Sequence, residues 1–459
     1  MTDRLSARTL EQLPPGVERP DYDVAALGVG VAHLGLGAFH RAHQAVFTED
    51  AIRAAGGDWG VAGISLRHAD AAAALTPQDG LYAVEFLGEA PRLRVVGAVR
   101  RALSAAQDAE AILAVMAAPT THIVSLTVTE KAYRLDAAGA LDLDDPDIAH
   151  DLTRPARPAS AVGWLTEGLA GRREAGGAPV SVLSCDNLMG NGRKLEAAVL
   201  TLAERWDPAL AAWIRAEAAF PQTMVDCIVP ATSAASRERI EAALGLADQA
   251  CVSRETFAQW VIEDRFAGPR PAWERAGAEF VADVAPYERL KLHVLNAAHS
   301  ALAYLGLKHG RDLVREAIAD PALSGFVDAL MAEEIGPALP ELPVADYWRG
   351  CRARFANPRL DYRLAQIGEV GSSKLAQRVF PLLIANARAG RPTRRLAEII
   401  HAWLELAGQG RVKDPQGPRL QSWAGSGCDA GDIFDDAALF PEAFRREPAV
   451  RRALTGSPV

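Results

Sequence analysis

The sequence of 459 residues is poor in cysteine, and none of its five cysteines belongs to a C-x-x-C pair. This scarcity argues against a disulfide framework and against a thiolate zinc site, and it favours a reducing compartment. No run approaches the roughly 18 apolar residues that a membrane-spanning helix needs. The stretch MTDRLSARTLEQLPPGVERP lacks the apolar core of a signal peptide. The cysteines are Cys185, Cys227, Cys251, Cys351 and Cys428. We therefore expect a cytoplasmic protein without a membrane segment.

Basic tracts are also missing from the sequence. The formal net charge is −9, and no run rich in lysine and arginine is interleaved with aromatic residues. A nucleic-acid partner is disfavoured, because that kind of binding usually needs a basic stripe. With 49 % hydrophobic and 23 % charged residues, the chain is long enough for two well-packed domains.

Short apolar runs alternate with helical patterns in the first part of the chain. The predicted strands are 29–37, 59–67, 93–99, 121–128 and 178–187, and helical segments such as AQDAEAILAVMAA lie between them. This alternation predicts a mostly parallel sheet with helices on both faces. From Pro286 onward, predicted helices follow one another at 286–308, 311–318, 322–335, 373–389 and 393–407. We expect an α/β domain followed by a helical domain.

The segment HLGLGAFHRAHQA (33–45) places a glycine-rich turn between a predicted strand and an amphipathic stretch, 40–55. Gly35 and Gly37 would give the tight turn and the close backbone approach that a pyrophosphate needs. His40 stands where a third glycine is usual. The pattern predicts a cofactor site, with an ordinary strand-to-helix turn as the alternative; its candidate residues are Gly35, Leu36, Gly37, Ala38, Phe39, His40 and Arg41.

Two further patterns bear on the cofactor and on metal binding. Asp70 follows the second predicted strand, where a carboxylate accepts the ribose hydroxyls of adenosine and repels a 2′-phosphate. We therefore expect NAD rather than NADP, although Arg67 nearby weakens this preference. His40 and His43 lie on one helical face, but no third ligand accompanies them at a suitable spacing, so we predict no metal site.

The segment APYERLKLHVLNAAHSALAYLG (285–306) predicts a buried helix with four polar side chains. With Lys291 at zero and about 100° per residue, Glu288 falls at roughly 60°. His299 then falls at roughly 80° and Asn296 at roughly 140°. Such groups suit proton transfer coupled to hydride transfer, because a lysine of lowered pKa can take a hydroxyl proton and an amide can stabilise the alkoxide. A core helix with satisfied polar residues is the alternative.

The segment SCDNLMGNG (184–192) predicts a strand that runs into a turn. Asn187 lies where this strand ends, and ligands of open α/β folds collect at such ends. Its amide could be a second donor to the reacting oxygen. As plain turn residues, Asn187 and Asn191 would need no functional explanation.

Six segments occur in order along the chain: HLGLGAFHRAHQA, IVSLTVTEKAY, SCDNL-x-x-NG, MVD-x-I-x-P, QWVIEDRFAGPRPAWE and LK-x-x-x-LN-x-x-H. Together they resemble the polyol-specific long-chain dehydrogenases, the mannitol dehydrogenase family, and most closely its fructuronate reductases (mannonate oxidoreductases). The resemblance implies a Rossmann-type NAD-binding domain (1–285), a helical substrate-binding domain (286–459) and no zinc. The resemblance also implies that Lys291 is the catalytic acid/base and that Asn187 and Asn296 form the pocket for the reacting oxygen. It implies that His299 positions the substrate and that Glu288 governs proton release. The substrate-binding candidates are Lys131, Asp226, Gln366, Lys374 and Arg378.

The sequence departs from the family where the substrate is concerned. Cys227 replaces the arginine of the family motif MVDRI, so the contact of that arginine is absent or supplied elsewhere. Gln366 and Lys131 replace an arginine and a glycine of mannitol 2-dehydrogenases, and fructuronate reductases resemble the chain at both positions. Because a sugar acid carries a carboxylate, Lys131 or Arg378 could pair with it. We predict interconversion of D-fructuronate and D-mannonate with NAD.

Three alternatives stay open. The first is the oxidation of a polyol, by a mannitol 2-dehydrogenase or an arabinitol dehydrogenase. The second is an inactive NAD-binding sensor, against which the complete set of catalytic candidates argues. The third is a sugar-phosphate dehydrogenase, in which Arg352, Arg354 and Arg378 would form a cationic patch. The sequence makes no prediction of the oligomeric state.

Overall fold

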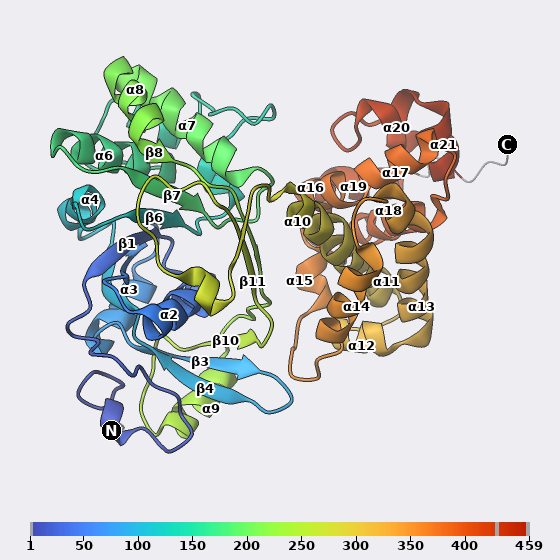
Figure 1. Ribbon diagram of the computed structural model, residues 1–459. Helices are drawn as coiled ribbons and strands as arrows, with labels where there is room; N and C mark the ends of the chain where they lie inside the picture. The colour runs from blue at the N-terminus through green and yellow to red at the C-terminus, as the bar shows by residue number, and fades with distance from the viewer. Residues whose placement is uncertain (1–2, 427–430, 456–459) are drawn as a thin grey trace. The chain divides into compact units, whose positions relative to one another are not determined.

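The computed structural model describes residues 3–426 and 431–455, so Cys428 lies outside the described residues. The chain divides into two compact units, Met1–Ala285 and Pro286–Val459 (Figure 1). The first unit combines strands and helices, and the second is helical. No helix in the described part of the chain is long and apolar enough to cross a membrane.

A parallel sheet of six strands forms the centre of the first unit, in the order β5-β2-β1-β6-β7-β8. The chain adds strands on one side of β1 and then returns to add β6 on its other side. This is the doubly wound order of a Rossmann-type domain, and ligands of such folds bind at the carboxyl ends of the strands where the order reverses. The strands are β1 (Val29–Leu34), β2 (Gly60–Ser65), β5 (Val99–Ser104), β6 (Ile123–Leu126), β7 (Val180–Ser184) and β8 (Ala218–Ala219).

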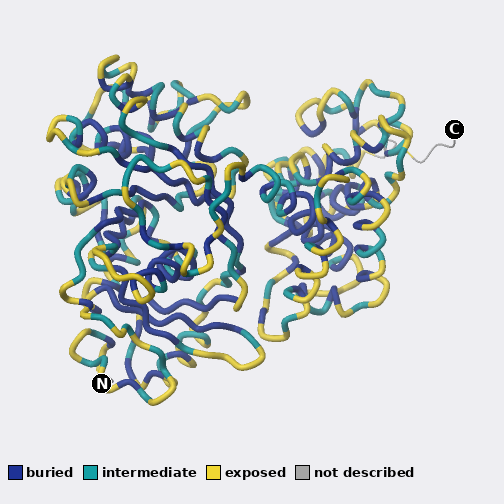
Figure 2. The backbone as a smooth tube through the Cα atoms, viewed as in Figure 1, coloured by how far each residue is buried: buried dark blue, intermediate teal, exposed yellow. Residues whose placement is uncertain are grey.

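Strand β1 is buried on both of its faces. Ala32 and Leu34 join a hydrophobic cluster that includes buried residues of several helices, and Val31 joins a second cluster with α2 (Gln44–Ala55). Successive side chains of a strand point to opposite faces, so a strand covered on both sides has a continuous apolar sequence. Figure 2 shows the central strands of this unit as buried. The α-helices of the first cluster are α4 (Ala109–Ala117), α5 (Pro146–Asp151), α6 (Ala161–Glu174), α7 (Asn191–Trp206) and α8 (Pro208–Glu217).

Two smaller sheets complete the first unit, with strand orders β10-β3-β4 and β12-β11-β9. The predicted strand 93–99 is wrong, because the chain turns at Gly97 and divides it between β4 in a small sheet and β5 in the central sheet. A Cβ atom at Gly97 would lie 2.9 Å from the side chains of Pro20 and Val24, so this turn requires glycine. The strands are β3 (Tyr82–Leu87), β4 (Arg92–Val96), β9 (Thr223–Asp226), β10 (Val252–Glu255), β11 (Gln259–Glu263) and β12 (Glu279–Val281).

The helix predicted after the glycine turn is broken in two. Helix α1 (Ala38–Ala42) ends at His43, whose backbone angles (φ −124°, ψ −87°) are not helical, and α2 begins at the next residue. The imidazole Nε2 of His43 lies 3.0 Å from the carbonyl oxygen of Gln259, and its ring packs edge-on against Trp260. These contacts hold His43 out of helical geometry, which the amphipathic pattern could not reveal.

Helix α11 (Asn296–Lys308) lies at the centre of the second unit. Every residue from Asn296 to Gly306 is buried, as expected for a helix that other helices surround. The predicted helix 373–389 is two helices that meet at Val379. The surrounding helices are α12 (Val314–Ala319), α13 (Pro321–Leu330), α14 (Val344–Phe355), α15 (Leu364–Gly368), α16 (Gly371–Arg378), α17 (Phe380–Arg388) and α18 (Arg394–Gly408).

Candidate functional site

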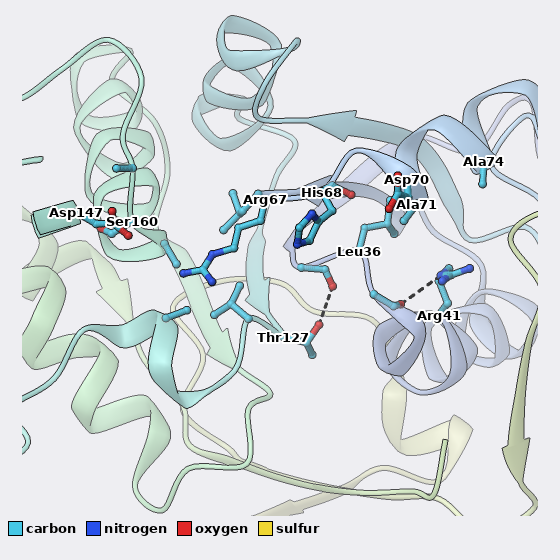
Figure 3. Close-up of a pocket in the computed structure, with 18 of the residues that line it drawn as sticks. Leu36, Arg41, Arg67, His68, Asp70, Ala71, Ala74, Thr127, Asp147 and Ser160 are labelled. Carbon is cyan, nitrogen blue, oxygen red and sulfur yellow. Dashed lines mark hydrogen bonds between the residues drawn. The ribbon is translucent and has the colours of Figure 1, made fainter. Parts of the chain in front are cut away.

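A cavity of about 450 Å³ lies at the carboxyl ends of β1, β2 and β6 (Figure 3). Five predicted cofactor residues line it, namely Gly35, Leu36, Gly37, Arg41 and Asp70. The other three, Ala38, Phe39 and His40, are not among the lining residues. The cavity is therefore at the reversal of the strand order, where this type of fold binds its ligand.

Positions 35 and 37 of the turn are occupied by glycine for different structural reasons. Gly35 has φ +102°, and a Cβ atom there would lie 2.1 Å from the carbonyl oxygen of Thr127. The hydroxyl of Thr127 donates to the carbonyl oxygen of Gly35 (2.8 Å), which fixes the turn (Figure 3). At Gly37 a Cβ atom would meet nothing closer than 3.8 Å, so the backbone faces open space. This space fits the close approach of a phosphate group.

His40 packs beneath the turn. Its ring stacks on His33 of β1, with centroids 3.4 Å apart, and both nitrogens of His33 bond to hydroxyls of Ser125 and Thr127. Burial, and then the neighbouring His33, hold the pKa of His40 well below its usual value, so the ring is uncharged. Within residues 3–426 and 431–455, no group of three His, Cys, Asp or Glu side chains is arranged to hold a metal ion.

Charged side chains of both signs line the cavity. Asp70 begins helix α3 (Asp70–Leu75), and Arg67 and His68 extend from the end of β2 beside it (Figure 3). Arg41 donates from Nε to the carbonyl oxygen of Gly37 (3.2 Å) and from Nη1 to that of Ala250. Burial lowers the pKa of Arg41 below its usual value. The cavity thus offers a carboxylate at the end of β2 and a guanidinium beside the glycine turn.

A buried carboxylic acid joins two other predicted site segments. Asp186 accepts hydrogen bonds from the backbone N–H of Thr129 (2.7 Å) and the hydroxyl of Tyr133 (2.9 Å). Burial raises the pKa of Asp186 to about 6, although these two donors oppose the rise. Thr129 has φ +76°, a conformation that β-branched residues rarely adopt. Asp186 therefore fixes the loop that carries Lys131 to the strand end that carries Asn187.

Asp186 was missed in the sequence because it stands between a strand and a turn, where an acid is ordinary. Lys131 and Asn187 are both exposed. Asn191 instead has a structural role, since its buried amide bonds to the backbone N–H and carbonyl of Thr223. Asp226 ends β9 and is 4 % exposed.

The helix of Lys291 contains a π turn, which the sequence did not predict. Helix α10 (Ala285–Leu290) passes into π geometry over Lys291–Leu295, and α geometry resumes at Asn296. A π turn advances by roughly 80° per residue, so Asn296 lies at roughly 40° from Lys291 and His299 at roughly −20°. With Glu288 still at roughly 60°, the four polar side chains span about 80° instead of about 140°.

His299 is an uncharged, buried imidazole with a free ring nitrogen. Its ring stacks on Phe355 with centroids 4.3 Å apart, and Nε2 has no hydrogen-bond partner in the described part of the chain. Burial, followed by the cations Arg378, Arg354 and Lys374, holds the pKa of His299 well below its usual value. These cations belong to helices α14 and α16 of the second unit.

Helix α16 carries two of the predicted substrate residues. The guanidinium of Arg378 donates to the carbonyl oxygen of Asn296 (3.3 Å) and the hydroxyl of Ser300 (3.2 Å). The ammonium of Lys374 donates to the carbonyl oxygen of Ile367 (2.9 Å). Arg378 thus lies against the first turn of α11, while Gln366 is exposed on α15.

Family models match both units in succession. The mannitol dehydrogenase Rossmann domain matches residues 29–275, and the mannitol dehydrogenase C-terminal domain matches residues 283–424.

Individual relatives cover most of the chain. A D-mannonate oxidoreductase of Escherichia coli (strain K12) is 42 % identical over 417 residues, which are 88 % of this chain and 86 % of the relative. A mannitol 2-dehydrogenase of Cereibacter sphaeroides is 40 % identical over 413 residues, which are 88 % of this chain and 86 % of the relative. The structure of Pseudomonas fluorescens mannitol 2-dehydrogenase, a ternary complex with NAD and D-mannitol, has a TM-score of 0.88 at 34 % identity and covers 98 % of this chain and 95 % of that one.

Proposed function

The chain belongs to the mannitol dehydrogenase family and is an oxidoreductase, and we propose that it interconverts D-fructuronate and D-mannonate with NAD as its cofactor. The observation that supports the choice of a sugar acid is Arg378, whose half-buried guanidinium lies against the first turn of α11, beside Asn296 and Ser300. A carboxylate binds such a cation through charge-assisted hydrogen bonds, whereas a polyol has no charge to pair with it. The similarity to a D-mannonate oxidoreductase agrees with this choice.

The choice of NAD rests on the first unit. The glycine turn and the open space at Gly37 fit a pyrophosphate, and Asp70 would accept the ribose hydroxyls. Arg41 would meet the negative charge of the phosphates from beside the turn. When bound, the nicotinamide supplies the acceptor or donor of a hydride.

In the oxidation direction, the amine of Lys291 takes the proton of the substrate hydroxyl as hydride leaves the same carbon, and the carbon–oxygen bond becomes a carbonyl. The amide N–H group of Asn296 stabilises the negative charge that develops on this oxygen. Glu288 then passes the proton from Lys291 toward water. His299 holds a substrate hydroxyl through its free Nε2 atom. Reduction follows the same steps in reverse.

Oxidation of a polyol is the second candidate, because mannitol 2-dehydrogenases resemble the chain nearly as closely. A panel of keto sugars and keto sugar acids, each assayed with NADH and with NADPH, separates the possibilities. We expect consumption of NADH with the acids. Consumption with neutral ketoses alone would favour the polyol enzyme, and binding of NADH without consumption on any substrate would favour a sensor.

A further inference from the structure

Arg254 is a buried arginine that connects three backbone carbonyl groups near the cofactor turn. It lies on β10, is 3 % exposed and packs over the ring of Phe86. Its guanidinium donates to the carbonyl oxygens of Ala42 (2.9 Å), Glu255 (2.9 Å) and Phe257 (3.1 Å). Ala42 is the last residue of α1, the short helix that directly follows Gly37.

The carboxyl end of α1 needs such a partner. The last carbonyl groups of any helix lack donors within the helix, and a cation near them is favourable. Because the chain breaks at His43, helix α2 cannot supply the missing donors. The hydroxyl of Tyr82 donates to the carbonyl oxygen of Arg41 (2.7 Å), and Arg254 donates to that of Ala42. Side chains of the sheet β10-β3-β4 therefore hold α1 at this end.

Backbone contacts relate Arg254 to Cys227. The N–H of Glu255 donates to the carbonyl oxygen of Ile228 (3.0 Å), and the N–H of Ile228 donates to the Glu255 carboxylate (2.6 Å). Cys227 directly precedes Ile228 in the chain, and Arg254 directly precedes Glu255. Burial lowers the pKa of Arg254 below its usual value, and the nearby Cys227 side chain partly offsets this.

We propose that Arg254 supplies the guanidinium that the family motif MVDRI places at the position of Cys227, and that it is a positioning residue for the cofactor turn. By holding the end of α1, it fixes the orientation of the helix and of the turn Gly35–Gly37 at its other end. This proposal rests on the cofactor site proposed above.

The test measures the dissociation constant of NADH by fluorescence. Loss of a buried charge-assisted bond to α1 should weaken NADH binding about tenfold in Arg254→Met. The turnover number at saturating NADH and the KM for the keto acid should change by less than about threefold, because Arg254 does not touch the reacting atoms. Arg254→Lys keeps the charge but not the forked geometry, so it should give an intermediate loss. Cys227→Arg combined with Arg254→Met should recover the wild-type affinity to within about threefold.

Arg94→Met is the matched control. Arg94 is also 3 % exposed and packs over Phe86, but it pairs with Asp50 in α2. This variant should lower the melting temperature and leave NADH affinity unchanged. If Arg254→Met binds NADH as tightly as Arg94→Met, or if the double variant shows no recovery, the proposal is wrong. A wild-type protein that binds no NADH would instead contradict the proposed function.

Discussion

Lys291 places an ammonium group at the start of a buried helix segment. The residue is half-buried, and every residue from Leu292 to Gly306 is buried. In the proposed mechanism this amine takes and returns the proton of the substrate hydroxyl. The other three side chains of the polar arc are a carboxylate, an amide and an uncharged imidazole, so Lys291 is the amine among them.

Lys291→Ala should therefore lower the turnover number by about 10²- to 10⁴-fold, the usual contribution of general acid–base catalysis. The dissociation constant of NADH should stay within about threefold, because the proposed cofactor site lies in the first unit. Lys308→Ala is the control: Lys308 lies on the same helix and pairs with Glu405 (2.6 Å). Full activity of Lys291→Ala in steady-state assays would refute the mechanism.

Asp186 gives a pH-dependent prediction. Its pKa is about 6 in the folded protein and about 3.9 in an unfolded chain, so the folded state binds the proton more tightly. The contribution of Asp186 to the free energy of unfolding is therefore greatest below about pH 4 and falls as the pH rises toward 6. Urea unfolding across this range should show a decline that is about 1–3 kcal/mol smaller in Asp186→Asn than in the wild type. Parallel pH profiles for the two proteins would contradict the assignment.

At the scale of elements, the sequence predicts which segments form helices and strands, but not where a helix is interrupted. The strands around the glycine turn and the long helix from 286 to 308 follow from apolar patterning, which survives in the structure. The break at His43 was not predictable from local patterning, because its imidazole contacts the distant carbonyl oxygen of Gln259. The π turn at Lys291 was not predictable, because apolar patterning does not distinguish a single π turn from α geometry. The polar candidates on this helix stand out in the sequence because such residues are unusual in a core. A regular α-helix overestimates the angle that they span around the helix axis, because the π turn reduces it.

Helix α16 contains a strained residue at its start. Val370 caps the helix with φ +59° and ψ 38°, a left-handed conformation that is costly for a β-branched residue. Val370→Gly should raise the free energy of unfolding by about 1 kcal/mol, because relief of this strain exceeds the entropy that glycine loses. Val379→Gly, at the other end of the helix with φ −119°, should be destabilising. A urea denaturation series measures both, and equal destabilisation would show that Val370 is not strained.

At the scale of the whole molecule, the hydrophobic cores belong to separate units. One cluster contains only residues from Leu290 to Leu454, and the three others lie within the first 278 residues. Separate cores allow separate unfolding transitions. The cofactor candidates and the cavity are in the first unit, whereas Lys291, Asn296 and His299 are in the second.

NADH should therefore stabilise one unit more than the other. At a concentration of about 100 times its dissociation constant, a ligand stabilises the form that binds it by about 2.7 kcal/mol. Calorimetry should show two transitions, of which NADH raises one. Hydrogen exchange should assign that transition to β1, β2 and β6 rather than to α11 and α18. An equal shift of both transitions would contradict separate cores.

The most direct measurement for the proposed function is the ratio of kcat/KM values for D-fructuronate and D-fructose with NADH. The two substrates share the reacting ketone, and the carboxylate distinguishes them. Pairing of this carboxylate with a half-buried cation is worth about 1.5–3 kcal/mol, so the ratio should exceed about 10 in favour of the acid. Equal kcat/KM values would contradict a sugar-acid enzyme and leave the polyol reaction.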